Sequence, residues 1–220
     1  EGNPSFKQKV NRAVNKTSRD EITIKFPCVE TTDEFNEKNL AYLMDFLYSN
    51  SDFIVVPLMP DLLDKIKEDD GGTGSAYFDK YLHNVDIFLE LAESINNKPI
   101  MGTIPALPWD FTDRLVSKYI DAGVRSFCFD FDGRVVTANT QLSEMVMPLM
   151  RRISVGGLQE EVFMYALNAH RGRTKGGEIK PARDMASLGF GFDMLGNKHI
   201  APSLPPHIYE KMEESEPEID

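Results

Sequence analysis

The chain has 220 residues, of which 41% are hydrophobic and 27% charged, and its net charge is −11. This composition is ordinary for a globular protein, and no apolar run is long enough to span a bilayer. Only Cys28 and Cys128 are present, which excludes a disulfide framework and a multi-cysteine zinc cluster. The first residues resemble no secretory signal, so we expect a cytoplasmic protein without a membrane partner.

Six runs rich in β-branched and aromatic residues predict strands, and amphipathic helical patterns separate them. The predicted strands are Glu21–Cys28, Phe53–Met59, Pro99–Pro105, Ser126–Arg134, Glu161–Ala169 and Phe190–Leu195.

Helical patterns fill the gaps between these runs. Thr31 and Glu34 form a capping-box signal for the first helix. A long helix is predicted from about Tyr77 to Ile95, and another from about Phe111 that ends before Gly123. Pro148 is expected to kink the helix that follows the fourth strand.

Alternating strands and helices predict βαβ units and a parallel sheet. No glycine-rich dinucleotide fingerprint and no Walker A loop follows a strand, which disfavours the Rossmann and P-loop folds. The expected fold is therefore an α/β protein with a TIM-barrel-like parallel (β/α) barrel over residues 21–209. Because six strands are two short of eight, we expect this barrel to be incomplete or truncated. Residues 1–20 are interpreted as a leader or outlying helix, and the acidic tail 210–220 as disordered.

The fourth predicted strand contains the strongest candidates for a functional site, because two carboxylates lie at its end. Alternation puts Cys128, Asp130 and Asp132 on one face and three phenylalanines on the other. Asp130 and Asp132 could bind a divalent cation, form a general acid/base pair, or act as nucleophile and stabiliser. Alternatively, one of them caps the next helix or forms an ion pair with Arg125 or Arg134.

Asn168 lies near the end of the fifth predicted strand, and His170 and Arg171 follow it directly. A glycine-rich basic loop with Arg173 comes next. A His-Arg pair at a strand end suits a carboxylate or phosphate ligand, and His170 could also carry a proton. The alternative is a surface histidine beside a solvated basic loop.

Further candidates for ligand binding are Arg134 after the fourth strand, and Asp193 and His199 around the sixth. For the last two, a turn or a helix cap is the simpler explanation. Segment 151–183 is locally basic on an acidic chain, which suits a small anionic ligand or RNA.

The stretch Lys98–Pro105, continuing through Tyr119–Val124 to Phe129 and Asp130, resembles the tRNA-guanine transglycosylase family. The resemblance implies a (β/α)8 barrel, a transferase that binds a nucleobase, and a role for Asp130 or Asp132 as catalytic carboxylate. It also implies a structural zinc, which two distant cysteines do not provide. The resemblance therefore implies that this chain is a divergent member of the family, with lost or altered transferase activity.

Three functions follow from these observations. The first is a transglycosylase-like domain that binds a nucleobase-containing or anionic ligand at the carboxyl ends of its strands. The second is a metal-assisted lyase or aldolase-type enzyme that uses Asp130 and Asp132. The third is a non-catalytic assembly or RNA-binding domain of a larger protein. Apart from a divalent cation, the sequence indicates no cofactor.

Overall fold

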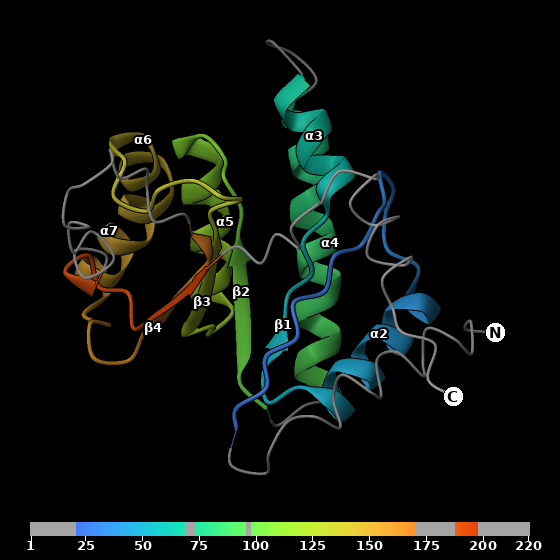
Figure 1. Ribbon diagram of the computed structural model, residues 1–220. Coiled ribbons are helices and arrows are strands. Elements are labelled where there is room, and N and C mark those ends of the chain that lie inside the picture. Colours follow the sequence, from blue (N-terminus) through green and yellow to red (C-terminus); the bar gives the residue numbers. More distant parts are fainter. Residues whose placement is uncertain (1–20, 69–73, 96–97, 170–187, 198–220) are drawn as a thin grey trace, which may run out of the picture.

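The computed structural model describes residues 21–68, 74–95, 98–169 and 188–197 (Figure 1). Its elements, in chain order, are α2 (Glu37–Asn50), β1 (Ile54–Val55), α3 (Pro60–Glu68), α4 (Gly74–Ile95), β2 (Ile100–Ile104), α5 (Trp109–Asp121), β3 (Ser126–Asp130), α6 (Asn139–Gln141), the π-helical turn η1 (Leu142–Val146), α7 (Met147–Gly156), β4 (Phe163–Ala169) and β5 (Met194–Asn197).

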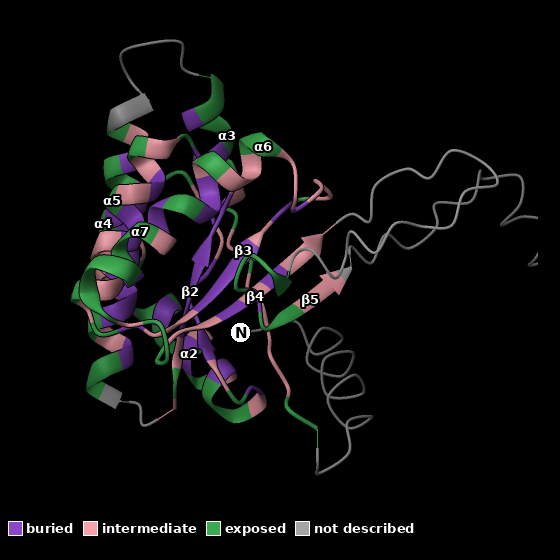
Figure 2. Cartoon of the chain, turned by 90° about the vertical axis from the view of Figure 1, so that its left-hand side faces the viewer, coloured by how far each residue is buried: buried purple, intermediate pink, exposed green. Residues whose placement is uncertain are grey.

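The five strands form one parallel sheet, and their order across it is their order in the chain. Helices α4, α5 and α7 lie on the same side of this sheet (Figure 2). A doubly wound fold would reverse strand order and place helices on both faces. Sequential winding with one helix layer is the architecture of a (β/α) barrel, so the predicted fold class is confirmed. Within the described residues the sheet stays open between its two edges.

The main core fills the space between the sheet and the helix layer. Alternate strand residues such as Ile104, Phe127 and Phe129 point into it and are fully buried. Helix α5 lies so close to β2 that a Cβ atom on Gly102 would come 2.8 Å from the Tyr119 ring. The absence of a side chain at position 102 therefore sets the distance between this helix and the sheet.

The opposite face of the sheet carries a second apolar cluster, built around Val55, Met101 and Cys128. Across this face the ring of Phe26 stacks on Tyr165 at 5.6 Å, and Phe53 stacks on Phe163 at 6.3 Å. These partners come from opposite sides of the sheet, so the sheet is curled and its concave face is packed like the interior of a barrel.

Residues 21–29, predicted as the first strand, run beside β1 and meet it in a parallel bridge between Cys28 and Leu58. The backbone N–H of Asp52 also donates to the Thr23 carbonyl. The segment is thus an extended edge of the sheet, although its hydrogen bonds are too few for a regular ladder. The second predicted strand is shorter than expected because only Ile54–Val55 pair regularly with β2.

Several local expectations are corrected by the structure. Helix α2 is capped by Asn36, whose side chain accepts from the N–H of Lys38, so the Thr31–Glu34 capping box is wrong. Helix α3 was not predicted. The helix expected after the fourth strand consists of α6, the π-helical turn η1 and α7, and Pro148 sits in the first turn of α7, directly after the π-helical turn.

The last predicted strand is displaced, since β5 begins at Met194 and ends at Asn197. The proposed leader 1–20, the tail 210–220 and most of the helix expected near Pro181–Leu188 lie outside the described residues. Among the helices that are described, none combines the length and apolar character needed to cross a membrane.

Candidate functional site

Asp130 is the last residue of β3, at the carboxyl edge of the sheet. Phe129 and Phe131 on either side of it are fully buried against the helix layer, while Asp130 is half-buried. Alternation along β3 therefore holds as predicted as far as Asp130, because the two phenylalanines anchor the strand end on the core side. In a parallel barrel-type sheet this edge is where ligands bind.

One carboxylate oxygen of Asp130 is fixed by two hydrogen bonds. Its Oδ1 accepts from Nδ2 of Asn168 at 2.9 Å and from the backbone N–H of Asp132 at 3.0 Å. Within the described part of the chain, no hydrogen bond reaches Oδ2 of Asp130. The carboxylate is thus held in orientation through one oxygen, which leaves the other available to a ligand.

The backbone around this carboxylate adopts an uncommon conformation at two positions. Asp132 has a φ of 46° and Asn168 a φ of 54°, both in the left-handed region. The Asn168 carbonyl accepts from the N–H of Gly133 at 2.8 Å, which ties the end of β4 to the turn after β3. Such conformations cost about 1–3 kcal/mol each and are concentrated at functional sites.

Asp132 and Arg134 lie beyond the end of β3, in the turn that follows it. The Asp132 carboxylate is exposed and lies 3.7 Å from Nη1 of Arg134. Arg125, the other predicted partner, is instead 3.5 Å from Glu161 at the opposite end of the strand. The predicted ion pair thus exists for Asp132, whereas Asp130 is held by hydrogen bonds.

Two groups near Asp130 were missed by sequence reasoning. Partial burial raises the pKa of the Cys28 thiol, although the residue remains exposed, and the Asp130 carboxylate raises this pKa further. Burial raises the pKa of the Tyr81 hydroxyl well above its ordinary value, and Asp130 and then Cys28 add to that effect. The position of Cys28 at the end of the first predicted strand was a usable signal. Nothing in the sequence marked Tyr81, which lies among the apolar residues of α4.

Asp193 does not join this group. It precedes β5, and its Oδ2 accepts from the backbone N–H of Met164 at 2.8 Å, near the amino end of β4. The sequence predicts Asp193 near the end of the sixth strand, whereas in the structure the strand begins only at Met194. His170, Arg171, Arg173 and His199 lie outside the described residues.

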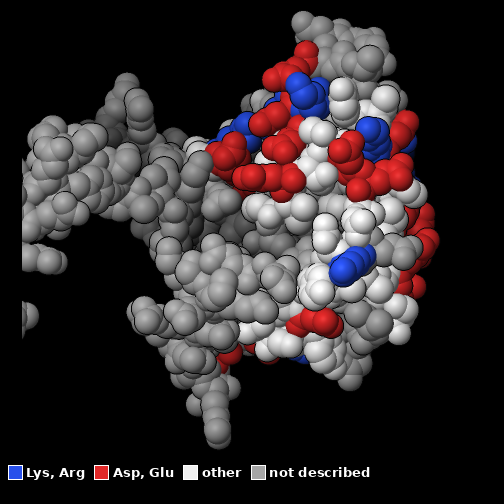
Figure 3. Space-filling view, turned by 90° about the vertical axis from the view of Figure 1, so that its right-hand side faces the viewer, with Lys and Arg blue, Asp and Glu red and all other residues white. Residues whose placement is uncertain are grey.

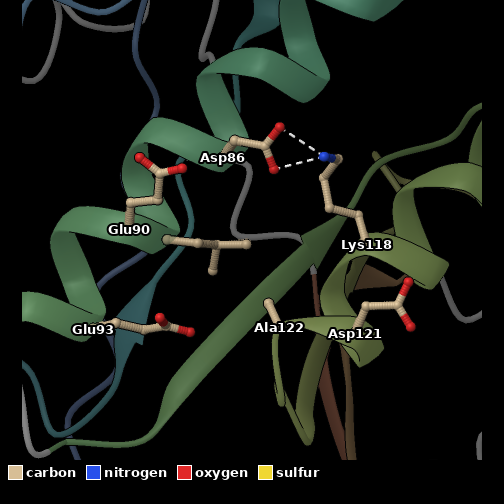
Figure 4. A pocket seen from close by; sticks show the side chains of 7 residues that line it. Asp86, Glu90, Glu93, Lys118, Asp121 and Ala122 are labelled. Atoms are coloured by element: carbon tan, nitrogen blue, oxygen red, sulfur yellow. Dashed lines mark hydrogen bonds and ion pairs between the residues drawn. The ribbon is translucent and has the colours of Figure 1, made fainter.

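Acidic side chains are prominent on the side of the molecule that is on the right in Figure 1 (Figure 3). A surface hollow of about 300 Å³ lies between α4 and α5 and is lined by Asp86, Glu90, Glu93 and Asp121 (Figure 4). Lys118 binds both oxygens of Asp86 at 2.6 Å in this hollow. The hollow belongs to the helix layer and contains none of the predicted site residues.

The structure describes residues 151–169 of the predicted basic segment 151–183. The basic residues in this described part are Arg151 and Arg152, both on α7. The guanidinium of Arg152 donates to Asp113 through Nε at 3.1 Å and Nη2 at 2.6 Å. This hydrogen bonding lowers the pKa of the Asp113 carboxyl. Arg152 is therefore engaged in a contact between α5 and α7.

Binding of a divalent cation is one of the alternative roles predicted for Asp130 and Asp132. Among the described residues there is no cluster of three or more His, Cys, Asp and Glu side chains that could hold a metal ion. The carboxylate of Asp130 lies at the end of β3, and that of Asp132 lies in the turn beyond it, beside Arg134. This pair of carboxylates fits a hard cation such as Mg²⁺ or Mn²⁺, which commonly takes one or two protein carboxylates and fills its other positions with water or substrate.

No family model and no curated protein matches the chain. Among solved structures, the chain is similar to 2,3-dimethylmalate lyase, a member of the PEP mutase/isocitrate lyase superfamily. For its triclinic crystal form the TM-score is 0.46 at 15% identity, over 86% of this chain and 60% of that one. For the trigonal form it is 0.45 at 13% identity, over 89% and 62%. The chain thus spans about three fifths of the structures it matches.

The resemblance to tRNA-guanine transglycosylases is wrong as a family assignment. No family model matches, and the similar solved structures belong to a different barrel superfamily. The transferase activity and the nucleobase ligand that followed from the resemblance are dropped with it. The fold explains the sequence pattern that suggested the resemblance. Lys98–Pro105 forms β2 with its flanking residues, and Tyr119–Val124 covers the end of α5 and the turn after it.

Proposed function

We propose that this domain is a metal-assisted lyase or aldolase-type enzyme that acts on a small anionic substrate at the carboxyl edge of its sheet. The observation that carries the proposal is the carboxylate of Asp130. It sits half-buried at the end of β3, fixed through Oδ1 by Asn168 and Asp132, and Oδ2 has no hydrogen bond within the described residues.

In this proposal, Asp130 is the principal cation ligand and Asp132 the second carboxylate. A divalent cation bound there would supply the positive charge that stabilises an enolate when a C–C bond beside a carbonyl or carboxylate is broken. The contribution of the chain is orientation. Asn168 and the N–H of Asp132 prevent the Asp130 carboxylate from rotating, so the cation and its substrate would be held in one position.

Arg134 supports an anionic substrate at this edge, because its guanidinium is only partly exposed and lies 3.7 Å from the Asp132 carboxylate. The predicted roles of His170 and Arg171 in carrying a proton and orienting the substrate remain part of the proposal. Both residues follow β4 directly, and β4 pairs with β3 in a register that sets Leu167 opposite Asp130.

The test is an activity screen with a panel of short 2- and 3-hydroxy carboxylates in the presence of Mg²⁺ or Mn²⁺. Carbonyl products are detected with a hydrazine reagent. We expect turnover that a chelator abolishes and that Asp130→Asn lowers by at least about a hundredfold, since the metal ligand is lost. Asp193→Asn is the matched control, because Asp193 lies at the other end of the sheet. Turnover that persists in Asp130→Asn would overturn the assignment of the site.

A further inference from the structure

The hydroxyl of Tyr81 is a buried polar group without a hydrogen-bond partner among the described residues. Tyr81 is fully buried on α4, its ring stacks with Phe78, and within the described structure its hydroxyl makes no hydrogen bond. Leaving a polar group in this condition is unfavourable, because the hydroxyl gives up its hydrogen bonds to water without gaining one in the protein. The other large buried tyrosine, Tyr119, shows the usual solution, since its hydroxyl donates to the Thr103 carbonyl at 3.0 Å.

The first half of α4, where Tyr81 lies, belongs to the carboxyl end of the sheet. Helix α4 ends just before β2, so it runs antiparallel to the strands and begins at their carboxyl ends (Figure 1). Phe78, one turn before Tyr81, stacks at 4.4 Å on Phe111 in the first turn of α5, which follows the carboxyl end of β2. Tyr81 and Asp130 thus lie at the same end of the sheet, where the strands have their carboxyl ends.

Cys28 reaches the same level from the other edge of the sheet. Phe26 and Tyr165 stack across the concave face, and Cys28 and Leu167 each come two residues later along parallel segments. Leu167 is paired in register with Asp130. Cys28 is exposed and is bridged to Leu58, beyond the end of β1. The influence of Asp130 and Cys28 on the Tyr81 hydroxyl agrees with this convergence of three elements.

We propose that Tyr81 is a binding residue of the Asp130 site, where its hydroxyl donates a hydrogen bond to an oxygen of the bound anion, and that Cys28 borders the same pocket. The inference rests on the proposed function, because it takes the ligand to be a small oxygen-rich anion held at Asp130. The hydroxyl is closed off from solvent here, so binding requires a small movement of the side chains around it. Tyr81 stays protonated at physiological pH and is therefore a donor.

The experiment uses Mn²⁺ and oxalate as probes, because oxalate is a planar dianion that resembles the enolate of a 2-oxo acid. Calorimetric titration gives the affinity for Mn²⁺ alone and then for oxalate at saturating Mn²⁺. We expect Tyr81→Phe to weaken oxalate binding by about tenfold, the loss of one hydrogen bond to a charged ligand, and to leave Mn²⁺ affinity unchanged. Phe is the conservative replacement because it keeps the ring that packs on Phe78.

A second measurement needs no substitution. Iodoacetamide should modify Cys28 and spare Cys128, which is fully buried, and peptide mapping distinguishes the two. We expect Mn²⁺ with oxalate to slow modification of Cys28 at least about fivefold by covering it.

The outcomes separate the two proposals. If Mn²⁺ and oxalate bind but neither Tyr81→Phe nor the alkylation rate responds, the further inference is overturned and the proposed function stands. If Mn²⁺ binding is absent, or is unaffected by Asp130→Asn, the proposed function fails and this inference fails with it.

Discussion

Asn168 at the end of β4 donates from Nδ2 to Oδ1 of Asp130 at the end of β3, over a distance of 2.9 Å. The two residues are 38 positions apart in the sequence. Parallel pairing of β3 with β4 brings them together, and the left-handed backbone of Asn168 accompanies the contact. The relationship makes Asn168 the residue that orients the candidate metal ligand.

A pair of substitutions at Asn168 separates the hydrogen bond from the backbone conformation. Asn168→Ala removes the amide and places an unfavourable residue at φ 54°, so we expect a loss of about 2–4 kcal/mol in the free energy of unfolding. Asn168→Gly removes the same hydrogen bond but adopts this conformation freely, and should be less destabilised by about 1 kcal/mol. Urea unfolding of the two variants measures the difference. Equal stabilities would show that the conformation carries no strain.

The contact between α5 and β2 gives a prediction about the fold. Gly102→Ala places a Cβ 2.8 Å from the Tyr119 ring, which is fully buried and held by its hydroxyl bond to Thr103. We expect destabilisation of about 1–3 kcal/mol from overpacking. In a protein that already carries Tyr119→Leu, the same Gly102→Ala change should destabilise less, because the ring that the new Cβ would meet is gone. Thermal unfolding of the four proteins in this cycle tests the coupling, and strict additivity of the two changes would contradict the contact.

The thiol of Cys28 should report on its neighbour Asp130. Its pKa is raised first by burial and then by the Asp130 carboxylate, so the fraction of thiolate at neutral pH is reduced. Asp130→Asn removes the negative charge, which lowers the pKa of Cys28 and shifts its alkylation profile to lower pH. Iodoacetamide rates measured across pH 7 to 10, about the range of a thiol titration, test this. An unchanged profile would place Cys28 out of reach of Asp130.

The ion pair between Asp113 and Arg152 predicts a small, pH-dependent contribution to stability. The Arg152 hydrogen bond lowers the pKa of Asp113 in the folded protein, so stabilisation is present above the unfolded pKa and is lost as pH falls through the folded one. The side chains are 22% and 44% exposed, and solvent screening limits the pair to about 0.3–1 kcal/mol.

The corresponding variant is Asp113→Asn, with Asp110→Asn, at the start of the same helix, as its control. We expect Asp113→Asn to be less stable than the unmodified protein near neutral pH and equally stable once Asp113 is protonated in both folded and unfolded chains. Urea unfolding at each pH measures this. A deficit that persists in acid would point to packing in place of the ion pair.

Strand identity and fold class could be predicted from the sequence because both depend on local patterns. The alternation of Phe127, Cys128 and Phe129 assigns the two phenylalanines to the helix side of β3 and Cys128 to its opposite face, and the strand-helix succession predicts a parallel sheet. The predicted ends of helices and strands are wrong where tertiary contacts determine them. Asn36 displaces Thr31 as cap of α2, and Asp193 precedes its strand because pairing with β4 starts at Met194.

The candidate site was only partly visible for the same reason. Asp130 was found because a carboxylate at the end of an apolar strand is conspicuous in a sequence. The hydrogen bond from Asn168 depends on the register between two strands, and the burial of Tyr81 depends on how α4 packs against the sheet. A buried tyrosine within a helix has no sequence signature that distinguishes it from a core residue. Only the structure shows that the Tyr81 hydroxyl makes no hydrogen bond within the described part of the chain.

The central claim is that Oδ2 of Asp130, which accepts no hydrogen bond from the described residues, marks a cation site. A Mn²⁺ titration followed by electron paramagnetic resonance tests this claim most directly. Free Mn²⁺ gives a sharp six-line signal that is broadened when the ion is bound. The account predicts one bound Mn²⁺ per chain in the unmodified protein and in Asp193→Asn, and loss of that binding in Asp130→Asn. Equal binding by Asp130→Asn and the unmodified protein, or no binding by either, would contradict it.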